Sequence, residues 1–152
     1  MVDIKTRNLV IYSFAKKVRK DLLNLYPEEE TYSYMNGVYT NRFFDHDYCG
    51  ACAVASYFLQ QGIKKKHNIT VDLVSNTAHA FCSIGDYVFD PTYSQYISNK
   101  PIYVGPGTKQ YHFTNYFMGA EETKEYWARW DEEQNPFSDF HQSKFHSWIK
   151  TI

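Results

Sequence analysis

The sequence is poor in cysteine, in net charge and in long hydrophobic runs, and each shortage excludes a class of protein. Three cysteines are an odd number and too few for a disulfide scaffold across 152 residues, which favours a reducing, intracellular location. The formal net charge is −1, whereas non-specific nucleic-acid binders usually carry a basic excess. No apolar run approaches the roughly 18–20 residues of a membrane-spanning helix, and no targeting segment is visible.

These shortages together predict a cytoplasmic protein that acts without nucleic acid and without a membrane. If the chain comes from a phage or is a bacterial effector, the predicted location is the interior of a host cell. The composition gives no prediction of the oligomeric state.

Aromatic residues are abundant, with fourteen Tyr, eleven Phe and three Trp. Such side chains supply large contact areas with polar ends. A chain of this length buries about two thirds of its unfolded surface on folding. We found no internal repeat, low-complexity tract or linker, so residues 1–152 are predicted to form a single domain with an aromatic core.

Hydrophobic periodicity predicts two helices in the first half of the chain. Apolar residues recur every four positions over residues 10–22, with basic residues between them, which indicates an amphipathic helix ending before Pro27. A second apolar stripe runs from Ala51 to Leu59 at helical spacing. Gly62 is predicted to stop this second helix, and the lysines at 64–66 are interpreted as a solvated turn after it.

The remaining segments predict strands followed by two more helices. Residues 28–48 are predicted to be irregular, with a short strand at 37–39, and residues after Pro91 to be loop-like through 107. The strand-like runs are Ile69–Val74, His79–Ile84, Tyr87–Phe89 and Tyr111–Phe113, and the later helices are predicted over 121–133 and 138–149. This order predicts an α+β fold in which a small antiparallel sheet packs against helices.

Cys52 is predicted to lie in the first turn of the second helix. The unpaired backbone N–H groups and the helix dipole at that position favour a thiolate, the reactive form of cysteine. On the helical wheel Cys52 falls at the margin of the apolar stripe, so its sulfur is expected to face a neighbouring element. Taken alone, the same position also suits a small buried hydrophobic residue.

His79 and Asp90 are predicted to meet on one face of a hairpin. If Gly85-Asp86 forms a two-residue turn, Ile84 pairs with Tyr87, and strand alternation then makes His79 and Asp90 diagonal neighbours. A carboxylate there can bind one imidazole nitrogen and leave the other nitrogen facing a thiol. The alternative interpretation is a structural His–Asp pair without catalytic function.

The motifs resemble those of the transglutaminase-like superfamily of papain-like folds, which includes arylamine N-acetyltransferases and glutamine-deamidase effectors. They are Cys-x-x-Ala-Ser from Cys52, Ala-His-Ala-Phe around His79, and Phe-Asp-Pro-Thr-Tyr-x-Gln-Tyr around Asp90. The run from Cys49 to Cys52 also resembles the cysteine segment of papain-type proteases. The resemblance covers residues 48–96. It implies that Cys52 is the nucleophile, His79 the general base and acid, and Asp90 the residue that orients the imidazole.

The resemblance also implies a reaction class and an oxyanion site. The expected enzyme is a cysteine hydrolase or acyltransferase that needs no cofactor and forms a Cys52 thioester with an amide substrate in a protein or peptide. Its outcome would be glutamine deamidation, transamidation or peptide cleavage. The sequence has His46 where a papain-type protease carries its oxyanion glutamine. The predicted oxyanion donors are the Cys52 N–H with His46 or Tyr48, and Gln95 is expected nearby.

Three other interpretations remain open. Cys49 and Cys52 form a Cys-x-x-Cys at a helix start, as in thiol-disulfide redox proteins, although the polar residues 41–47 do not form the buried strand typical of those folds. The chain could also be a catalytically inactive binding or inhibitory module. A zinc site at Asp45, His46, Asp47 and Cys49 lacks a second separated ligand pair, so no metal is predicted.

Overall fold

The computed structural model describes residues 3–33, 37–44, 50–76, 79–96, 100–108, 111 and 118–152. The helices are α1 (Ile4–Leu25), a 3-10 turn η1 (Pro27–Glu29), α2 (Ala51–His67), α3 (Tyr93–Tyr96), α5 (Ala120–Trp127) and α6 (Asp139–Ile149). The strands are β1 (Glu30–Ser33), β2 (Val38–Asn41), β3 (Asp72–Ser75), β4 (Ala80–Ile84), β5 (Tyr87–Asp90) and β6 (Tyr103–Pro106). The predicted α+β class is confirmed.

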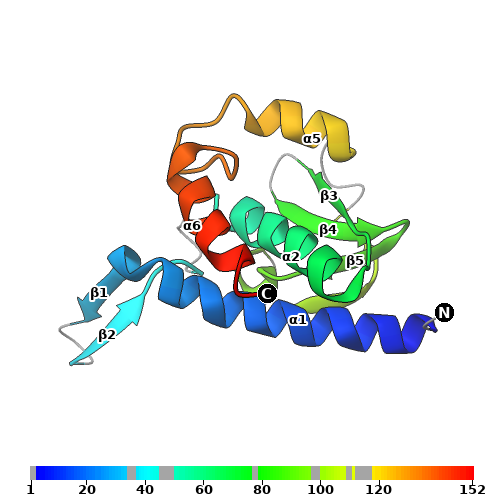
Figure 1. Cartoon of the computed structure of the whole chain (residues 1–152), viewed down its shortest axis with the longest axis horizontal. Helices are drawn as coiled ribbons and strands as arrows, with labels where there is room; N and C mark the ends of the chain where they lie inside the picture. The colour runs from blue at the N-terminus through cyan, green and yellow to red at the C-terminus, as the bar shows by residue number, and fades with distance from the viewer. Residues whose placement is uncertain are drawn as a thin grey trace.

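A four-stranded antiparallel sheet lies behind a layer of helices (Figure 1). Its strand order is β3-β4-β5-β6, so each strand pairs with the next one in the chain. Helix α2 packs on β4 and β3, α1 packs on α2, and α5 packs on β3. The separate ribbon of β1 and β2 projects beyond the C-terminal end of α1 (Figure 1).

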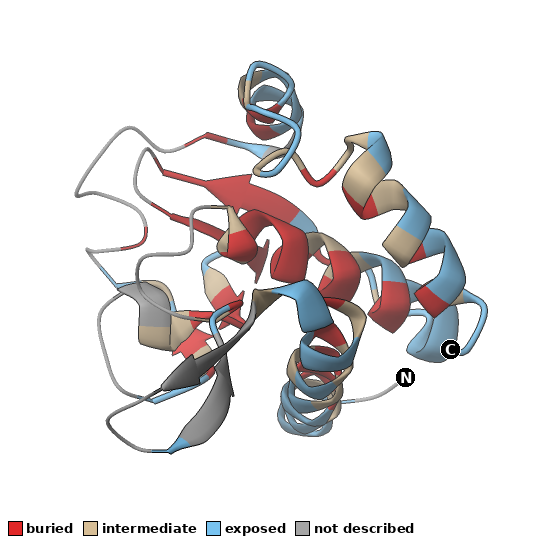
Figure 2. Ribbon diagram, turned by 90° about the vertical axis from the view of Figure 1, so that its left-hand side faces the viewer, coloured by how far each residue is buried: buried red, intermediate tan, exposed pale blue. Residues whose placement is uncertain are grey.

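Helix α2 is the central element of the core. Most of its residues from Ala51 to Ile63 are buried, because α1, α6 and the sheet all contact it (Figure 2). Burial on several sides explains why its sequence carries short side chains such as Ala53 and Ala55 beside Phe58. The start of α2 is therefore held in a fixed position relative to β4.

Helix α1 confirms the amphipathic pattern and extends it at both ends. Asp3 caps its start by accepting a hydrogen bond from the Thr6 N–H at 2.8 Å. Its inward face buries Phe14, Val18 and Leu22 against the core. The helix ends at Leu25, as the following Pro27 requires.

Gly62 does not stop α2, which contradicts the sequence prediction. The helix continues to His67 and ends at Asn68, which has a left-handed backbone with φ of 55°. Gly62 lies inside the helix, and the position requires glycine because a Cβ there would come within 2.6 Å of the Phe14 and Trp148 rings. The glycine thus serves close helix packing, and the lysines at 64–66 occupy the last turn of the helix rather than a turn after it.

We expect Gly62→Ala to destabilise the protein by about 1–3 kcal/mol, because the added methyl group overpacks two rigid rings. Helix propensity alone predicts the opposite sign, a gain of about 1 kcal/mol. Urea denaturation measures the difference. The matched control is Gln61→Ala on the exposed side of the same helix, for which a change within about 0.5 kcal/mol is expected. A more stable Gly62→Ala protein would contradict the close packing.

The β4–β5 hairpin follows the predicted register, with Ile84 opposite Tyr87 and Cys82 opposite Phe89. Two strands were missed. Strand β1 lies in the region predicted to be irregular, where it pairs with β2. Strand β6 lies in the predicted loop after Pro91, and its Gly105 and Pro106 are residues that strands disfavour except at sheet edges.

The C-terminal helices differ from the prediction in length. The predicted helix 121–133 is shorter, because α5 ends at Trp127 and a turn follows in which the Asp131 carbonyl accepts bonds from the Gln134 and Asn135 N–H groups. Helix α6 matches the predicted 138–149 closely, with Ser138 as its N-cap residue. Residues 112 and 113 of the predicted strand 111–113 lie outside the described residues.

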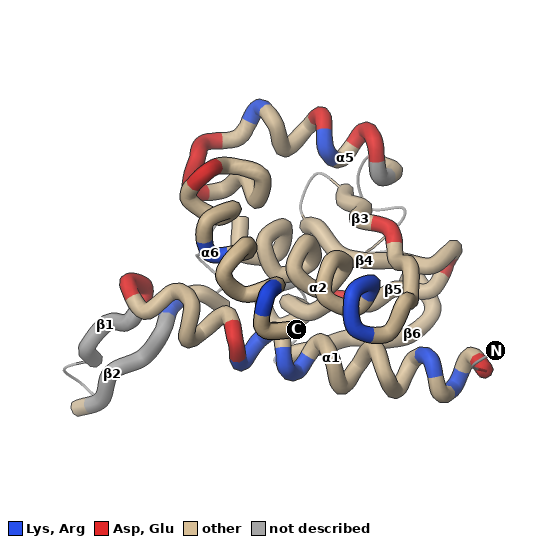
Figure 3. The backbone as a smooth tube through the Cα atoms, viewed as in Figure 1, with Lys and Arg blue, Asp and Glu red and all other residues tan. Residues whose placement is uncertain are grey.

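Surface charge is divided between different elements. Lysine and arginine residues lie along α1 and in the last turn of α2, while acidic residues lie on α5 and in the turn after it (Figure 3). Within the described ranges, no helix has the length and hydropathy needed to cross a membrane.

Candidate active site

Cys52 is the second residue of α2, as the sequence predicts, and it is half-buried and not in a disulfide. The preceding N-cap residue, Gly50, has a left-handed backbone with φ of 90° and supplies no capping side chain. Backbone N–H groups in the first turn of a helix have no intrahelical partner. The first turn of α2, which contains Cys52, therefore presents backbone donors that no side chain of the N-cap residue occupies.

Gly50 also fixes where the turn after α5 meets the start of α2. A Cβ at Gly50 would lie 2.7 Å from the Gln134 Cα, closer than real Cβ contacts allow. Only glycine satisfies both this approach and the positive φ. The turn around Gln134 thus packs directly against Gly50, two residues before Cys52.

His79 and Asp90 form a buried pair at the end of the sheet. His79 immediately precedes β4, and Asp90 is the last residue of β5. The His79 Nε2 lies 2.8 Å from the Asp90 Oδ2, and the two residues are 5% and 1% exposed. The diagonal pairing predicted from the hairpin register is confirmed, because the turn has the predicted two residues.

Cys52 interacts with the same imidazole, since its side chain is among the groups that raise the pKa of His79. Because Nε2 is bound to Asp90, Nδ1 is the ring nitrogen left for a thiol. Burial by itself lowers the pKa of His79, but the Asp90 carboxylate, its hydrogen bond and the Cys52 side chain outweigh burial and raise the pKa to about 10. The imidazole is therefore protonated at neutral pH.

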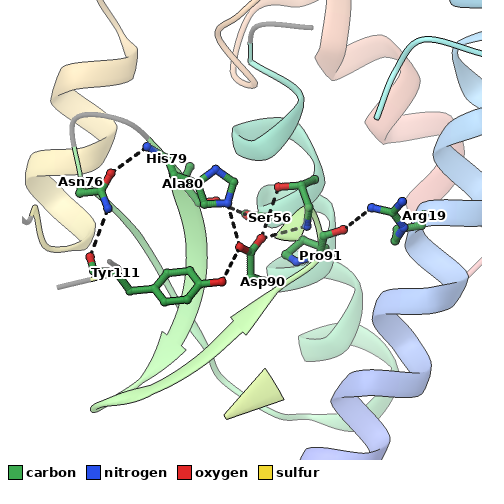
Figure 4. A network of polar contacts seen from close by, with 9 residues as sticks. Arg19, Ser56, Asn76, His79, Ala80, Asp90, Pro91 and Tyr111 are labelled. Carbon is green, nitrogen blue, oxygen red and sulfur yellow. Dashed lines mark hydrogen bonds and ion pairs between the residues drawn. The ribbon is translucent and has the colours of Figure 1, made fainter. Parts of the chain in front are cut away.

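Four hydrogen-bond donors surround the Asp90 carboxylate. Oδ2 accepts from His79 and from the Tyr111 hydroxyl at 2.9 Å, while Oδ1 accepts from the Thr92 N–H at 2.9 Å and the Thr92 hydroxyl at 3.3 Å (Figure 4). A buried carboxylate needs such partners, because polar groups removed from water cost free energy unless they are hydrogen-bonded. The four bonds fix the orientation of the Asp90 carboxylate beside His79.

Arg19 connects α1 to the same end of the sheet. Its guanidinium donates a 2.7 Å hydrogen bond to the Pro91 carbonyl (Figure 4). The same guanidinium lies over the Phe44 ring, 3.9 Å from its centroid. Burial lowers the pKa of Arg19, and the Asp90 charge opposes that shift. Arg19 thus places a positive charge close to the Asp90–Pro91 peptide and fixes the backbone that carries the carboxylate.

Ser56 ties α2 to β4 one helical turn below Cys52. Its hydroxyl donates to the Ala80 carbonyl at 3.4 Å, and the Cys82 thiol donates to the Ser56 carbonyl at 3.2 Å. Burial raises the pKa of the Cys82 thiol well above its usual value, with Asp90 and Asp72 adding to the shift. Cys82 is therefore a packed structural thiol, whereas Cys52 is the cysteine that meets the histidine.

The structure brings together Cys52, His79 and Asp90, the three residues predicted as a triad. The predicted oxyanion residues His46 and Tyr48, and the second redox cysteine Cys49, lie outside the described residues. Gln95 belongs to α3, but its side chain is also outside them. The Asp45–Cys49 ligand cluster is likewise undescribed, and the described part of the chain holds no group of three or more His, Cys, Asp or Glu suited to a metal.

Sequence reasoning missed the residues that support the pair. Thr92 carried a usable signal, because a threonine two residues after an aspartate often donates its N–H back to that carboxylate. Asn76, which binds the His79 backbone, sits three residues before it and is a similar local signal. Tyr111 and Arg19 come from distant segments, so no local pattern pointed to them.

Comparison with known proteins identifies no relative for this chain. No family model, curated protein or solved structure matches it. Its function must therefore be argued from the geometry of the site.

Proposed function

We propose that the protein is a cysteine-dependent hydrolase or acyltransferase that acts on an amide through a Cys52 thioester. One observation carries the proposal: a buried imidazole bonds a carboxylate through Nε2 and also interacts with the side chain of Cys52 at the start of α2. A nucleophile, a base and an orienting carboxylate in that order are the arrangement that activates a thiol. The motif resemblance to transglutaminase-like enzymes supports the same chemistry.

The proposed first step is attack of the Cys52 thiolate on a carbonyl carbon. The new C–S bond pushes the carbonyl electron pair onto oxygen, and the first-turn N–H groups of α2 are the donors proposed for that oxyanion. Collapse breaks the C–N bond, and the His79 imidazolium gives its proton to the leaving amine. The products of this step are an amine, or ammonia from glutamine, and a thioester.

The second step resolves the thioester and restores the site. Neutral His79 takes a proton from water or from an acceptor amine as that nucleophile attacks the thioester carbon. The C–S bond breaks and the thiolate leaves beside the imidazolium that has formed. Water gives net hydrolysis, and an amine gives transamidation. Four donors hold the two oxygens of Asp90 in place throughout.

The first test measures iodoacetamide alkylation of Cys52 between pH 6 and 8, with peptide mapping to separate the three thiols. When the pH is lowered from 8 to 6, the alkylation rate of an ordinary thiol with a pKa of about 8.5 falls roughly 75-fold, because its thiolate fraction falls by that factor. We expect Cys52 to lose less than about threefold, because imidazolium preserves the thiolate. Cys49 and Cys82 serve as internal comparisons. A Cys52 rate that follows the ordinary thiol curve would falsify the proposal.

The second test identifies the reaction. Wild-type protein and Cys52→Ala are incubated with a cell lysate, and peptides are compared by mass spectrometry for new termini, deamidated glutamines and crosslinks. A Cys52→Ser variant adds a trap, because a hydroxyl in place of the thiol slows resolution and leaves an ester with the acyl donor. Binding of partners that is identical in wild type and Cys52→Ala, without any covalent change, would favour an inactive binding module instead.

A further inference from the structure

The hydrogen bonds around Asp90 form a closed circuit of four residues (Figure 4). Asp90 Oδ2 accepts from His79 Nε2 and from the Tyr111 hydroxyl. The Tyr111 carbonyl accepts from Asn76 Nδ2 at 3.2 Å, and the Asn76 Oδ1 accepts from the His79 N–H at 2.8 Å, which returns the circuit to His79. A second backbone bond, from the Asn76 N–H to the His79 carbonyl, reinforces the closure.

Burial makes this circuit a built part of the site. Asn76, His79, Asp90 and Tyr111 are at most 5% exposed, and they come from three separate segments of the chain. Polar groups removed from water in this way cost free energy unless every bond is made. Tyr111 also packs edge-on against Phe81, which fixes the plane of its ring and the position of its hydroxyl.

We propose that Tyr111 is a positioning residue of this site, whose hydroxyl fixes the Asp90 carboxylate and shares the oxygen that binds His79, and so limits how tightly the carboxylate holds the imidazole proton. The inference rests on the proposed function, since it concerns the same nucleophile and base. The Tyr111 hydroxyl donates to the Asp90 carboxylate. It acts through Asp90.

The shared oxygen sets the direction of the effect. Two donors on Oδ2 divide its negative charge, so removal of the Tyr111 hydroxyl strengthens the remaining bond to His79. Burial and the neighbouring Asp90 raise the pKa of Tyr111, so this hydroxyl stays protonated and remains a donor at all working pH values. Loss of the hydroxyl therefore raises the pKa of His79, provided that Asp90 remains ionised.

Among the described residues, the other titratable groups around this site are unchanged by that substitution. They lie on α1, on α2, on β4 and just before β4, and they are Arg19, Cys52, Cys82 and His79. Tyr93 and Tyr103 stack on Tyr111 from the outer side of the cluster. A shift in His79 after a single hydroxyl is deleted can thus be assigned to the bond with Asp90.

The test compares two alkylating reagents at Cys52 in the full chain. Negatively charged iodoacetate is attracted by a neighbouring imidazolium, whereas neutral iodoacetamide is not, so the ratio of the two rates falls when His79 loses its proton. The thiolate fraction cancels in the ratio. In Tyr111→Phe we expect the midpoint of that fall to move up by about 0.5–1 pH unit, because one hydrogen bond to a charged acceptor is removed.

Two further variants make the test specific. Tyr103→Phe deletes a hydroxyl from the same aromatic stack, but that hydroxyl donates to the Pro106 carbonyl, so its midpoint stays at the wild-type value. Thr92→Val removes the weaker donor on Oδ1 and is expected to give a smaller rise, which keeps the test available if Tyr111→Phe does not fold.

Each outcome decides between the two proposals. A wild-type ratio that falls with pH and an unmoved or lowered midpoint in Tyr111→Phe overturn the role of Tyr111 alone. A wild-type ratio that is constant with pH overturns the proposed function and the role of Tyr111 with it. A raised midpoint in Tyr111→Phe with an unmoved one in Tyr103→Phe supports both.

Discussion

Replacing Asp90 by asparagine is expected to slow Cys52 alkylation at pH 6 by about 100-fold and to destabilise the fold by about 3–5 kcal/mol. The loss of reactivity follows because a neutral amide no longer holds the proton on His79, so the thiol loses its imidazolium neighbour. The loss of stability follows because the amide presents N–H groups to a site where all four partners are donors. Alkylation rates and urea denaturation measure the two effects separately.

Asp72→Asn is the matched control for this variant. It makes the same chemical change at the start of β3, in the same sheet, where the aspartate is exposed and makes no ion pair among the described residues. Both measurements are expected to stay close to wild type, with stability within about 0.5 kcal/mol. Equal behaviour of the Asp72 and Asp90 variants would mean that the buried pair has no special role.

The protein is expected to lose stability steeply as the pH rises above neutrality. The pKa of His79 is about 10 in the folded protein and about 6.5 in the unfolded chain. Below about pH 6.5 both states hold the proton, so the contribution to stability is complete. Above it the unfolded chain loses its proton first, and the free energy of unfolding falls by up to about 1.4 kcal/mol per pH unit until His79 titrates near pH 10. Urea denaturation at pH 7, 8 and 9 measures this slope.

Variants separate His79 from other groups that titrate in this range. In Asp90→Asn the slope between pH 7 and 9 is expected to disappear, because the carboxylate that raises the pKa of His79 is gone. Titration of Cys82 also lowers the free energy of unfolding at higher pH, since burial raises the pKa of its thiol in the folded protein. Keeping the measurements below pH 9 limits the effect of Cys82 on the slope. A wild-type stability that is flat from pH 7 to 9 would contradict the buried ion pair.

On the acid side the expected dependence has the opposite sign. Burial lowers the pKa of His141, whose Nδ1 lies 2.6 Å from the Tyr26 hydroxyl and whose Nε2 lies 2.6 Å from the Glu133 carbonyl. The unfolded chain therefore takes up a proton at this residue before the folded protein does, and stability falls as the pH drops below about 6.5. Together His79 and His141 place the expected stability maximum near pH 6–7.

The elements predicted correctly are those whose signal is local. Helix α1 carries a long four-residue repeat, and α6 carries a clear start at Ser138. The β4–β5 hairpin has a two-residue turn, which fixes its register without help from the rest of the chain. The same turn explains why the pairing of His79 with Asp90 could be derived from residue numbers alone.

The elements predicted wrongly depend on distant partners. Gly62 looks like a helix stop until the Phe14 and Trp148 rings are placed against it. Strand β6 exists because β5 offers it an edge, although its own residues have poor strand propensity. In both cases tertiary packing outweighs a local preference of about 1 kcal/mol.

The sequence by itself determined where the three residues of the candidate site lie in their elements, namely a cysteine at a helix start and a histidine and an aspartate joined by a short hairpin. The tertiary structure decided the rest: that the start of α2 comes to that histidine, that the Tyr111 hydroxyl donates to the aspartate, and that Arg19 binds the Pro91 carbonyl beside it. The physical reason is that these interactions act over different distances along the chain. Turn geometry and helix periodicity act over a few residues, whereas the donors that keep a buried carboxylate charged must be collected from wherever the folded chain brings them.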